Sequence, residues 1–188
     1  MKLKRIRSFA LMLALLSASA AFISCGKKQD GLNDTQSAQL INVAEAFYEC
    51  GLEFSSDDVI NTNQLEMFVY YLYNDELTAG ENGFGRVSFD EADAMVESIF
   101  GMGPAIHKNY STDGSSPLYS IGQNYYVKVE PSNFVSSEIE DVTLDDDGHY
   151  RAAVNFTDSE GMTTQLRMVF DVNKNDIRVL ECIQYVNK

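Results

Sequence analysis

The period at which apolar residues recur changes near Pro117, and this change restricts the fold more than any other feature of the sequence. Before Pro117, three segments (34–50, 63–75 and 88–100) repeat apolar residues every three to four positions, which is the spacing of amphipathic helices. After it, apolar and polar residues alternate in short runs separated by turn sequences, which is the pattern of antiparallel strands. The sequence therefore predicts an α+β fold, with about three N-terminal helices packed on an antiparallel meander sheet of about six strands.

Two of the expected helices carry start signals. Asn63-Gln64-Leu65-Glu66 resembles a capping box, in which the first and fourth residues satisfy each other's backbone N–H groups, and Ser88-Phe89-Asp90-Glu91 matches the same pattern. The glycine-rich stretch 78–85 between them predicts a loop. The order of elements loosely resembles the helix-on-curved-sheet folds of cystatins, and this analogy of fold implies no function.

The first 25 residues form a separate unit. Residues 1–7 carry four positive charges and no acid, residues 8–24 carry no charge, and Cys25 follows. A basic segment followed by an apolar segment and small residues predicts a secretory signal peptide. An uncharged run of this length also reaches the lower limit of a membrane span, so a retained single-pass anchor is the alternative.

The sequence Phe22-Ile23-Ser24-Cys25-Gly26 resembles the lipobox of bacterial lipoproteins. Ser24 and Gly26 fit the small positions on either side of the cysteine, whereas Phe22 replaces the usual leucine. The resemblance implies cleavage before Cys25, acylation of its sulfur, and anchorage to the cell membrane on the extracytoplasmic face or in the periplasm. It covers only this leader and implies nothing about the remaining chain.

These features divide the chain into three parts: a signal peptide (1–24), a lipidated cysteine with a polar tether (25–33) and a single α+β domain (34–188). Eight tether residues after Cys25 reach at most about 29 Å when extended, which predicts a domain held close to the membrane surface. The membrane, reached through the N-terminal lipid, is thus the first expected partner.

The charge of the chain excludes one class of partner. It has 28 acidic and 14 basic residues, and removal of the leader leaves ten basic residues and a formal charge of −18. A nucleic-acid-binding protein needs a basic surface, so no nucleic-acid partner is expected. An acidic body is also repelled by anionic lipid headgroups, which leaves the tether as the expected means of attachment.

Two cysteines, Cys50 and Cys182, remain after lipidation of Cys25. Outside the cytoplasm they are a candidate disulfide pair. The alternative is a pair of buried thiols, because Cys50 lies on an apolar helix face and Cys182 in an apolar strand. Neither has a CxxC partner or a neighbouring histidine, so neither is expected to be a nucleophile or a zinc ligand.

Glu181 is the carboxylate that the pattern singles out. Under strict alternation it shares a face with apolar residues of strand 177–186, Tyr185 included, so it is expected to point into the core face of the sheet. A carboxylate buried there would have a raised pKa, and Glu181 with Tyr185 would then line a pocket. The alternative is that Glu181 lies near a sheet edge or pairs with Arg167 or Arg178.

The acidic turns do not predict a metal site. The segment around Asp145–Gly148 and the segment 171–176 lack the glutamate that a calcium-binding loop needs at its twelfth position, so both are interpreted as hairpin turns. The sequence contains no hydrolase, zinc-protease or phosphate-loop motif. No catalytic residue, metal or cofactor is therefore predicted.

Three functions fit these observations. The leading hypothesis is a lipid-anchored, non-catalytic lipoprotein that binds an unidentified ligand or envelope protein outside the cytoplasm. The second is a cell-envelope hydrolase that uses carboxylates in a concavity of the sheet. The third is a structural or inhibitory partner protein.

The lipobox gives the first testable prediction. The intact mass of the membrane-extracted protein should equal that of residues 25–188 plus acyl chains, because processing removes the leader and modifies Cys25. An unprocessed mass would instead show that residues 8–24 stay in the membrane as an anchor.

Overall fold

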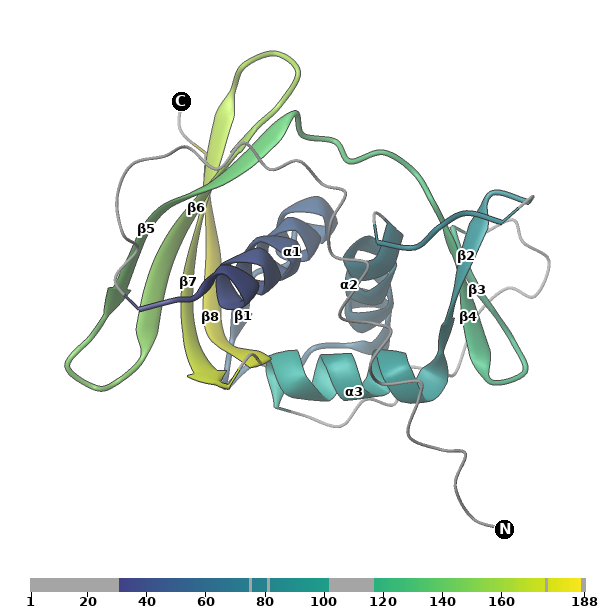
Figure 1. Ribbon diagram of the computed structural model, residues 1–188, viewed down its shortest axis with the longest axis horizontal. Helices are drawn as coiled ribbons and strands as arrows, with labels where there is room; N and C mark the ends of the chain where they lie inside the picture. Colours follow the sequence, from purple (N-terminus) through teal and green to yellow (C-terminus); the bar gives the residue numbers. More distant parts are fainter. Residues whose placement is uncertain (1–30, 75, 81, 102–116, 175, 187–188) are drawn as a thin grey trace, which may run out of the picture.

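The three helices lie between two antiparallel sheets (Figure 1). The computed structural model describes residues 31–74, 76–80, 82–101, 117–174 and 176–186. One sheet has five strands and the other three, and the helices α1, α2 and α3 fill the space between them. The predicted α+β class with antiparallel strands is confirmed.

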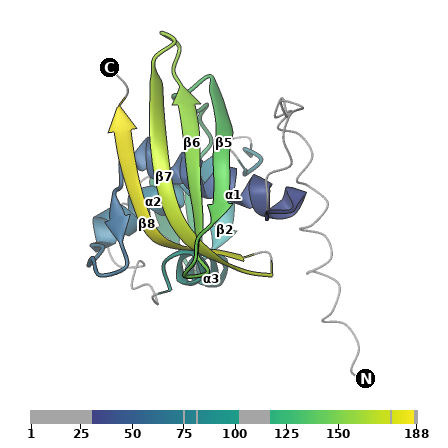
Figure 2. The ribbon, with the colours of Figure 1, turned by 90° about the vertical axis from the view of Figure 1, so that its left-hand side faces the viewer.

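The larger sheet has the strand order β1-β8-β7-β6-β5. Its strands are β1 (Phe54–Ser55), β5 (Ser136–Leu144), β6 (Tyr150–Thr157), β7 (Thr163–Asn173) and β8 (Asp176–Val186). Figure 2 shows this sheet from its outer side, with the helices behind it. From β5 onward it is the predicted meander, since each strand pairs with the next along the chain.

The smaller sheet has the order β2-β4-β3 and consists of β2 (Phe84–Ser88), β3 (Leu118–Ile121) and β4 (Asn124–Lys128). The six strands expected after Pro117 are all present, but they are divided between the two sheets.

Strand β2 starts inside the stretch 78–85 that was predicted to be a loop. Gly85 explains the difference: it is buried, and a Cβ there would overlap the Leu77 side chain, so this glycine marks a close approach within a strand.

Helix α1 (Asp34–Cys50) has the predicted bounds and a capped N-terminus. Asn33 Oδ1 accepts from the Gln36 N–H at 3.0 Å, and Gln36 Oε1 accepts from the Asn33 N–H at 2.8 Å. Its C-terminus ends at Gly51, whose φ of 60° is the left-handed conformation that glycine adopts without strain.

Helix α3 (Phe89–Phe100) begins as predicted, because Ser88 Oγ accepts from the Glu91 N–H at 3.3 Å. Helix α2 (Thr62–Asn74) is capped by different residues from those predicted. Asn61 and Gln64 form the reciprocal pair, at 3.0 and 3.1 Å, two positions before the expected box at Asn63. No helix in the described part of the chain is long and apolar enough to span a membrane.

Four phenylalanine rings join the helices to each other and to the larger sheet. Phe47 of α1, Phe68 of α2 and Phe100 of α3 contact one another edge to face, with ring centroids 4.9–5.7 Å apart. Phe54 of β1 lies 5.1 Å from Phe100. All four rings are buried, so this cluster is the point at which the three helices meet.

A β-bulge in β8 overturns the predicted orientation of Glu181. Val169 of β7 pairs with Glu181, but the next residue, Phe170, pairs with Val179, so Leu180 is an extra residue in β8. Before the bulge, Val179 is buried against the helices; beyond it, the buried residue is Cys182. Glu181 therefore lies on the outer face, and the expectation that it points into the core is wrong because strict alternation does not hold across a bulge.

The phenylalanine cluster makes a prediction about stability. Phe68→Ala should lower the free energy of unfolding by about 3–5 kcal/mol, because it removes a fully buried ring that contacts both neighbouring helices. Urea unfolding followed by circular dichroism measures the change. The matched control, Val59→Ala, concerns a side chain that is 93% exposed and should change stability by less than about 0.5 kcal/mol. Equal effects of the two substitutions would contradict the assigned core.

Candidate functional site

The outer face of the larger sheet carries a depression of about 370 Å³. In the described part of the chain no helix covers this face (Figure 2). Half-buried apolar side chains line the depression, namely Ala153, Val169 and Ile183. Polar and aromatic side chains line it as well: Asp141, Arg151, Arg167, Glu181 and Tyr185.

Arg167 and Tyr185 form a stacked pair in this depression. The guanidinium carbon of Arg167 lies 4.7 Å from the centroid of the Tyr185 ring, and Arg167 Nε donates to Gln165 Oε1 at 3.0 Å. Among the described residues, no carboxylate oxygen lies within 4.0 Å of the Arg167 side chain. Its two terminal nitrogens are therefore positioned by the stack and available to an acceptor from outside.

Arg151, the other arginine of the depression, already has a partner. Its Nε and Nη2 atoms both lie 3.0 Å from Asp145 Oδ2 in the β5–β6 turn. Backbone hydrogen bonding from His149, together with Arg151, holds the pKa of Asp145 below its usual value. His149 in turn contacts Asp171 at 2.6 Å, and this contact raises the pKa of the imidazole.

The structure brings together the two predicted pocket residues, Glu181 and Tyr185, but on the sheet face opposite to the expected one. Glu181 is half-buried and makes no ion pair with any described residue. Arg167, named as an alternative partner of Glu181, lines the same depression. Arg178, the other alternative, lies near Gly101 at the end of α3.

Sequence reasoning missed Arg151, Arg167 and Asp141 as site residues. A signal was present, because both arginines alternate with buried residues of their strands and so lie on the outer face. The sequence pattern gives no sign of the bulge at Leu180. This bulge places Glu181 and Tyr185 on the same side of the sheet as the two arginines.

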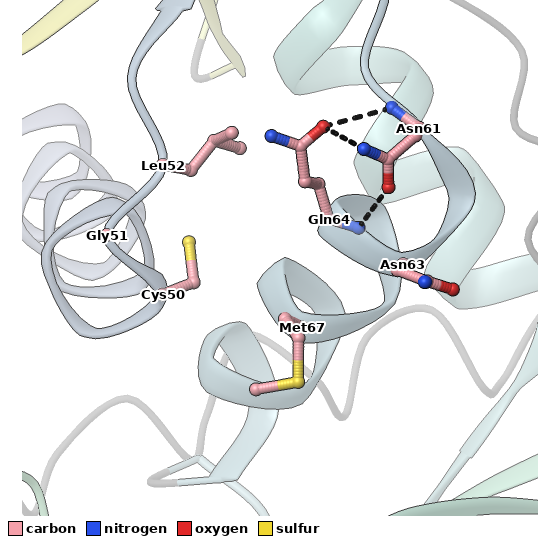
Figure 3. Close-up of a pocket in the computed structure, with 7 residues that line it drawn as sticks. All are labelled: Cys50, Gly51, Leu52, Asn61, Asn63, Gln64 and Met67. Carbon is pink, nitrogen blue, oxygen red and sulfur yellow. Dashed lines mark hydrogen bonds between the residues drawn. The ribbon is translucent and has the colours of Figure 1, made fainter.

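A second depression, of about 330 Å³, lies between the end of α1 and the start of α2 (Figure 3). Its lining includes Cys50, Leu52, Met67 and the capping pair Asn61 and Gln64, whose side chains hydrogen-bond to each other at 2.6 Å. None of the described residues that line it is charged. These residues offer a ligand fewer groups for ionic or hydrogen-bonding contacts than the residues on the outer sheet face do.

Cys50 and Cys182 are both free thiols in the structure. Burial raises the pKa of Cys50 to about 12, and burial also raises the pKa of Cys182. Both thiols therefore stay protonated at neutral pH, which disfavours a nucleophilic role. The disulfide between them stays a prediction. Cys25, the predicted lipidation site, lies outside the described residues.

The described ranges contain no group of three or more histidine, cysteine, aspartate or glutamate side chains placed to hold a metal ion. Comparison of the chain with protein-family models, with curated proteins and with solved structures finds no match. The candidate site therefore has to be judged on its own geometry.

The buried thiols give a prediction. In a Cys25→Ser variant, which leaves two cysteines, iodoacetamide at pH 8 should alkylate Cys50 about a thousandfold more slowly than after unfolding, because so little of it is thiolate. After unfolding in urea without reductant, two alkylated cysteines are expected by mass spectrometry. If unfolding without reductant exposed no reactive thiol and reductant released two, the cysteines would be paired.

Proposed function

We propose that the protein is a lipid-anchored bacterial lipoprotein of the extracytoplasmic face, and that its domain binds a ligand or an envelope protein without catalysis. The binding site in this proposal is the depression on the outer face of the larger sheet. The observation that carries it is the Arg167–Tyr185 stack: an arginine with no carboxylate partner among the described residues lies beside a half-buried apolar surface in a strongly acidic protein.

The chemistry of the stack indicates what the ligand carries. A guanidinium group held in place binds a carboxylate through two parallel hydrogen bonds. Tyr185 is 42% exposed and offers a flat apolar face with a polar tip. Glu181 in the same depression accepts hydrogen bonds from hydroxyl or amine groups. A peptide or small molecule with a carboxylate next to such donors fits this set of residues.

The alternative of an envelope hydrolase is supported less well. Asp141 and Glu181 both line the depression, as paired carboxylates of a glycosidase would. An acid catalyst, however, needs an apolar enclosure that keeps its carboxyl protonated near neutral pH. Asp141 is exposed and Glu181 is half-buried on an open sheet face, so neither has that enclosure.

The proposed site predicts the effect of one substitution. Arg167→Gln should lower retention of the ligand from a solubilised envelope extract about 10- to 100-fold, because a hydrogen bond to a charged group contributes about 1.5–3 kcal/mol. Mass spectrometry of the molecules that co-purify with the protein measures retention. Arg86→Gln, which changes an exposed arginine of β2 on the smaller sheet, is the matched control and should retain the ligand.

Three other results would contradict this proposal, and two of them would favour a different function. Equal retention by both variants would exclude the depression as the binding site. Release of products from purified cell wall, abolished by Glu181→Gln, would establish the hydrolase. A single protein recovered in equal amount with the lipoprotein, whether or not Arg167 is changed, would favour the structural or inhibitory role.

A further inference from the structure

The register of the larger sheet places the charged side chains of the outer-face depression in two rows. The strands β5, β6, β7 and β8 lie side by side (Figure 2). In the first row Asp141 of β5 pairs with Ala153 of β6, Ala153 pairs with Arg167 of β7, and Arg167 pairs with Ile183 of β8. Asp141 and Arg167 therefore lie on opposite sides of Ala153, about 10 Å apart at their Cα atoms, which is two strand spacings.

The second row lies two residues away along the strands. Here Arg151 of β6 pairs with Val169 of β7, and Val169 pairs with Glu181 of β8. Glu181 is consequently the diagonal neighbour of Arg167 on the adjacent strand, at a distance of about 7–8 Å. In strand order Arg167 thus lies between two carboxylates, Asp141 on one side and Glu181 on the other.

Three of the four charged side chains in these rows form no ion pair with a described residue: Asp141, Arg167 and Glu181. Arg151 is the exception, because Asp145 pairs with its guanidinium group. The three unpaired side chains comprise two carboxylates and one guanidinium group. Together they leave the depression with one formal negative charge in excess.

Contacts within the sheet hold Arg167 in place. Its Nε donates to Gln165 Oε1 at 3.0 Å, and its guanidinium group stacks on Tyr185, which lies four residues beyond Glu181 in β8. Gln165 is positioned in turn, because its Nε2 donates to Glu140 Oε2 at 2.8 Å. Opposite charges that are held apart in this way form a preorganised site for a ligand with the complementary charges.

We infer that the depression binds a free diamino acid of the lysine type; this inference rests on the proposed binding function of the same site. The α-carboxylate of the ligand binds Arg167, its α-ammonium group binds the nearer carboxylate, Glu181, and its second ammonium group binds Asp141. One anionic and two cationic groups match the three unpaired side chains. The half-buried Ala153 and Val169 form an apolar floor on which a four-carbon stem packs.

A simple carboxylic acid and a neutral amino acid match these charges less well. A carboxylic acid leaves both Asp141 and Glu181 without a partner and brings a further negative charge to a strongly acidic chain. An α-amino acid with an apolar side chain satisfies one of the two carboxylates. A second amine on the ligand satisfies the other.

The experiment measures the binding of L-lysine to the full-length protein in detergent by isothermal titration calorimetry at low salt, where screening is weakest. Three analogues each lack one charged group: norleucine lacks the side-chain amine, Nα-acetyl-lysine lacks the α-ammonium charge, and lysinamide lacks the carboxylate. Each analogue should bind the unaltered protein about tenfold more weakly than lysine does, because each loses a hydrogen bond between charged groups.

Substitutions in the depression should remove these differences one at a time. Asp141→Asn should bind lysine and norleucine equally, Glu181→Gln should not distinguish lysine from Nα-acetyl-lysine, and Arg167→Gln should not distinguish lysine from lysinamide. Glu138→Gln is the matched control, since it removes a charge from the same strand and the same sheet face as Asp141 but lies outside the depression. It should leave all four affinities unchanged, and circular dichroism checks that each variant is folded.

Equal binding of lysine and norleucine by the unaltered protein would overturn the diamino-acid ligand. Equal weakening of lysine binding by Glu138→Gln and Asp141→Asn would also overturn it, because the acidic protein would then attract cations without a specific site. Absence of lysine binding overturns this inference but leaves the binding function in place if Arg167→Gln still lowers retention of the ligand from an envelope extract. If lysine does not bind and Arg167→Gln leaves that retention unchanged, the proposed function fails as well.

Discussion

The rings of Phe47, Phe68 and Phe100 bring the three helices together, and this contact determines where both sheets can lie. Helices α1 and α3 then pack on β8 of the larger sheet, whereas α2 packs on β4 of the smaller one. Most residues of α2 between Leu65 and Asn74 are buried, so a single sheet on one side could not cover this helix. Placing the helices between two sheets covers them from both sides.

The same arrangement leaves the outer face of the larger sheet without a covering helix in the described part of the chain. The helices occupy the inner face of this sheet. The character of the outer face depends on the bulge at Leu180, which turns Glu181 and Tyr185 outward while Val179 and Cys182 remain buried. Without the bulge, half of β8 would present the wrong residues to the helices. The single inserted residue, Leu180, thus determines which side chains of β8 belong to the core and which belong to the proposed site.

Charge connects the proposed site to the proposed anchor. The acidic body has no electrostatic attraction to an anionic bilayer, so in the proposed lipoprotein attachment would depend on the lipid and the short tether. Among the described cations, Arg151 forms an ion pair with Asp145 and Lys128 forms one with Glu130. Arg167 instead stacks on Tyr185, and its terminal nitrogens are the groups that we propose bind the ligand.

The sequence by itself determined the α+β class, the bounds of α1, the cap of α3 and the strands from β5 onward. Those features follow from local periodicity and from capping chemistry that acts over three or four residues. The sequence also pointed to Glu181 and Tyr185 as neighbours. The tertiary structure alone decided which face they share, because a bulge is a property of strand pairing and leaves no local signature.

The tertiary structure also decided how the strands divide between two sheets. Gly85 illustrates the reason: in the sequence it belongs to a glycine-rich stretch that resembles a loop, whereas in the fold its lack of a side chain lets Leu77 pack against a strand. Arg167 shows the same dependence, since its neighbours Gln165 and Tyr185 meet only through the pairing of β7 with β8. Contacts between residues far apart in the chain are set by packing as a whole, and no local pattern encodes them.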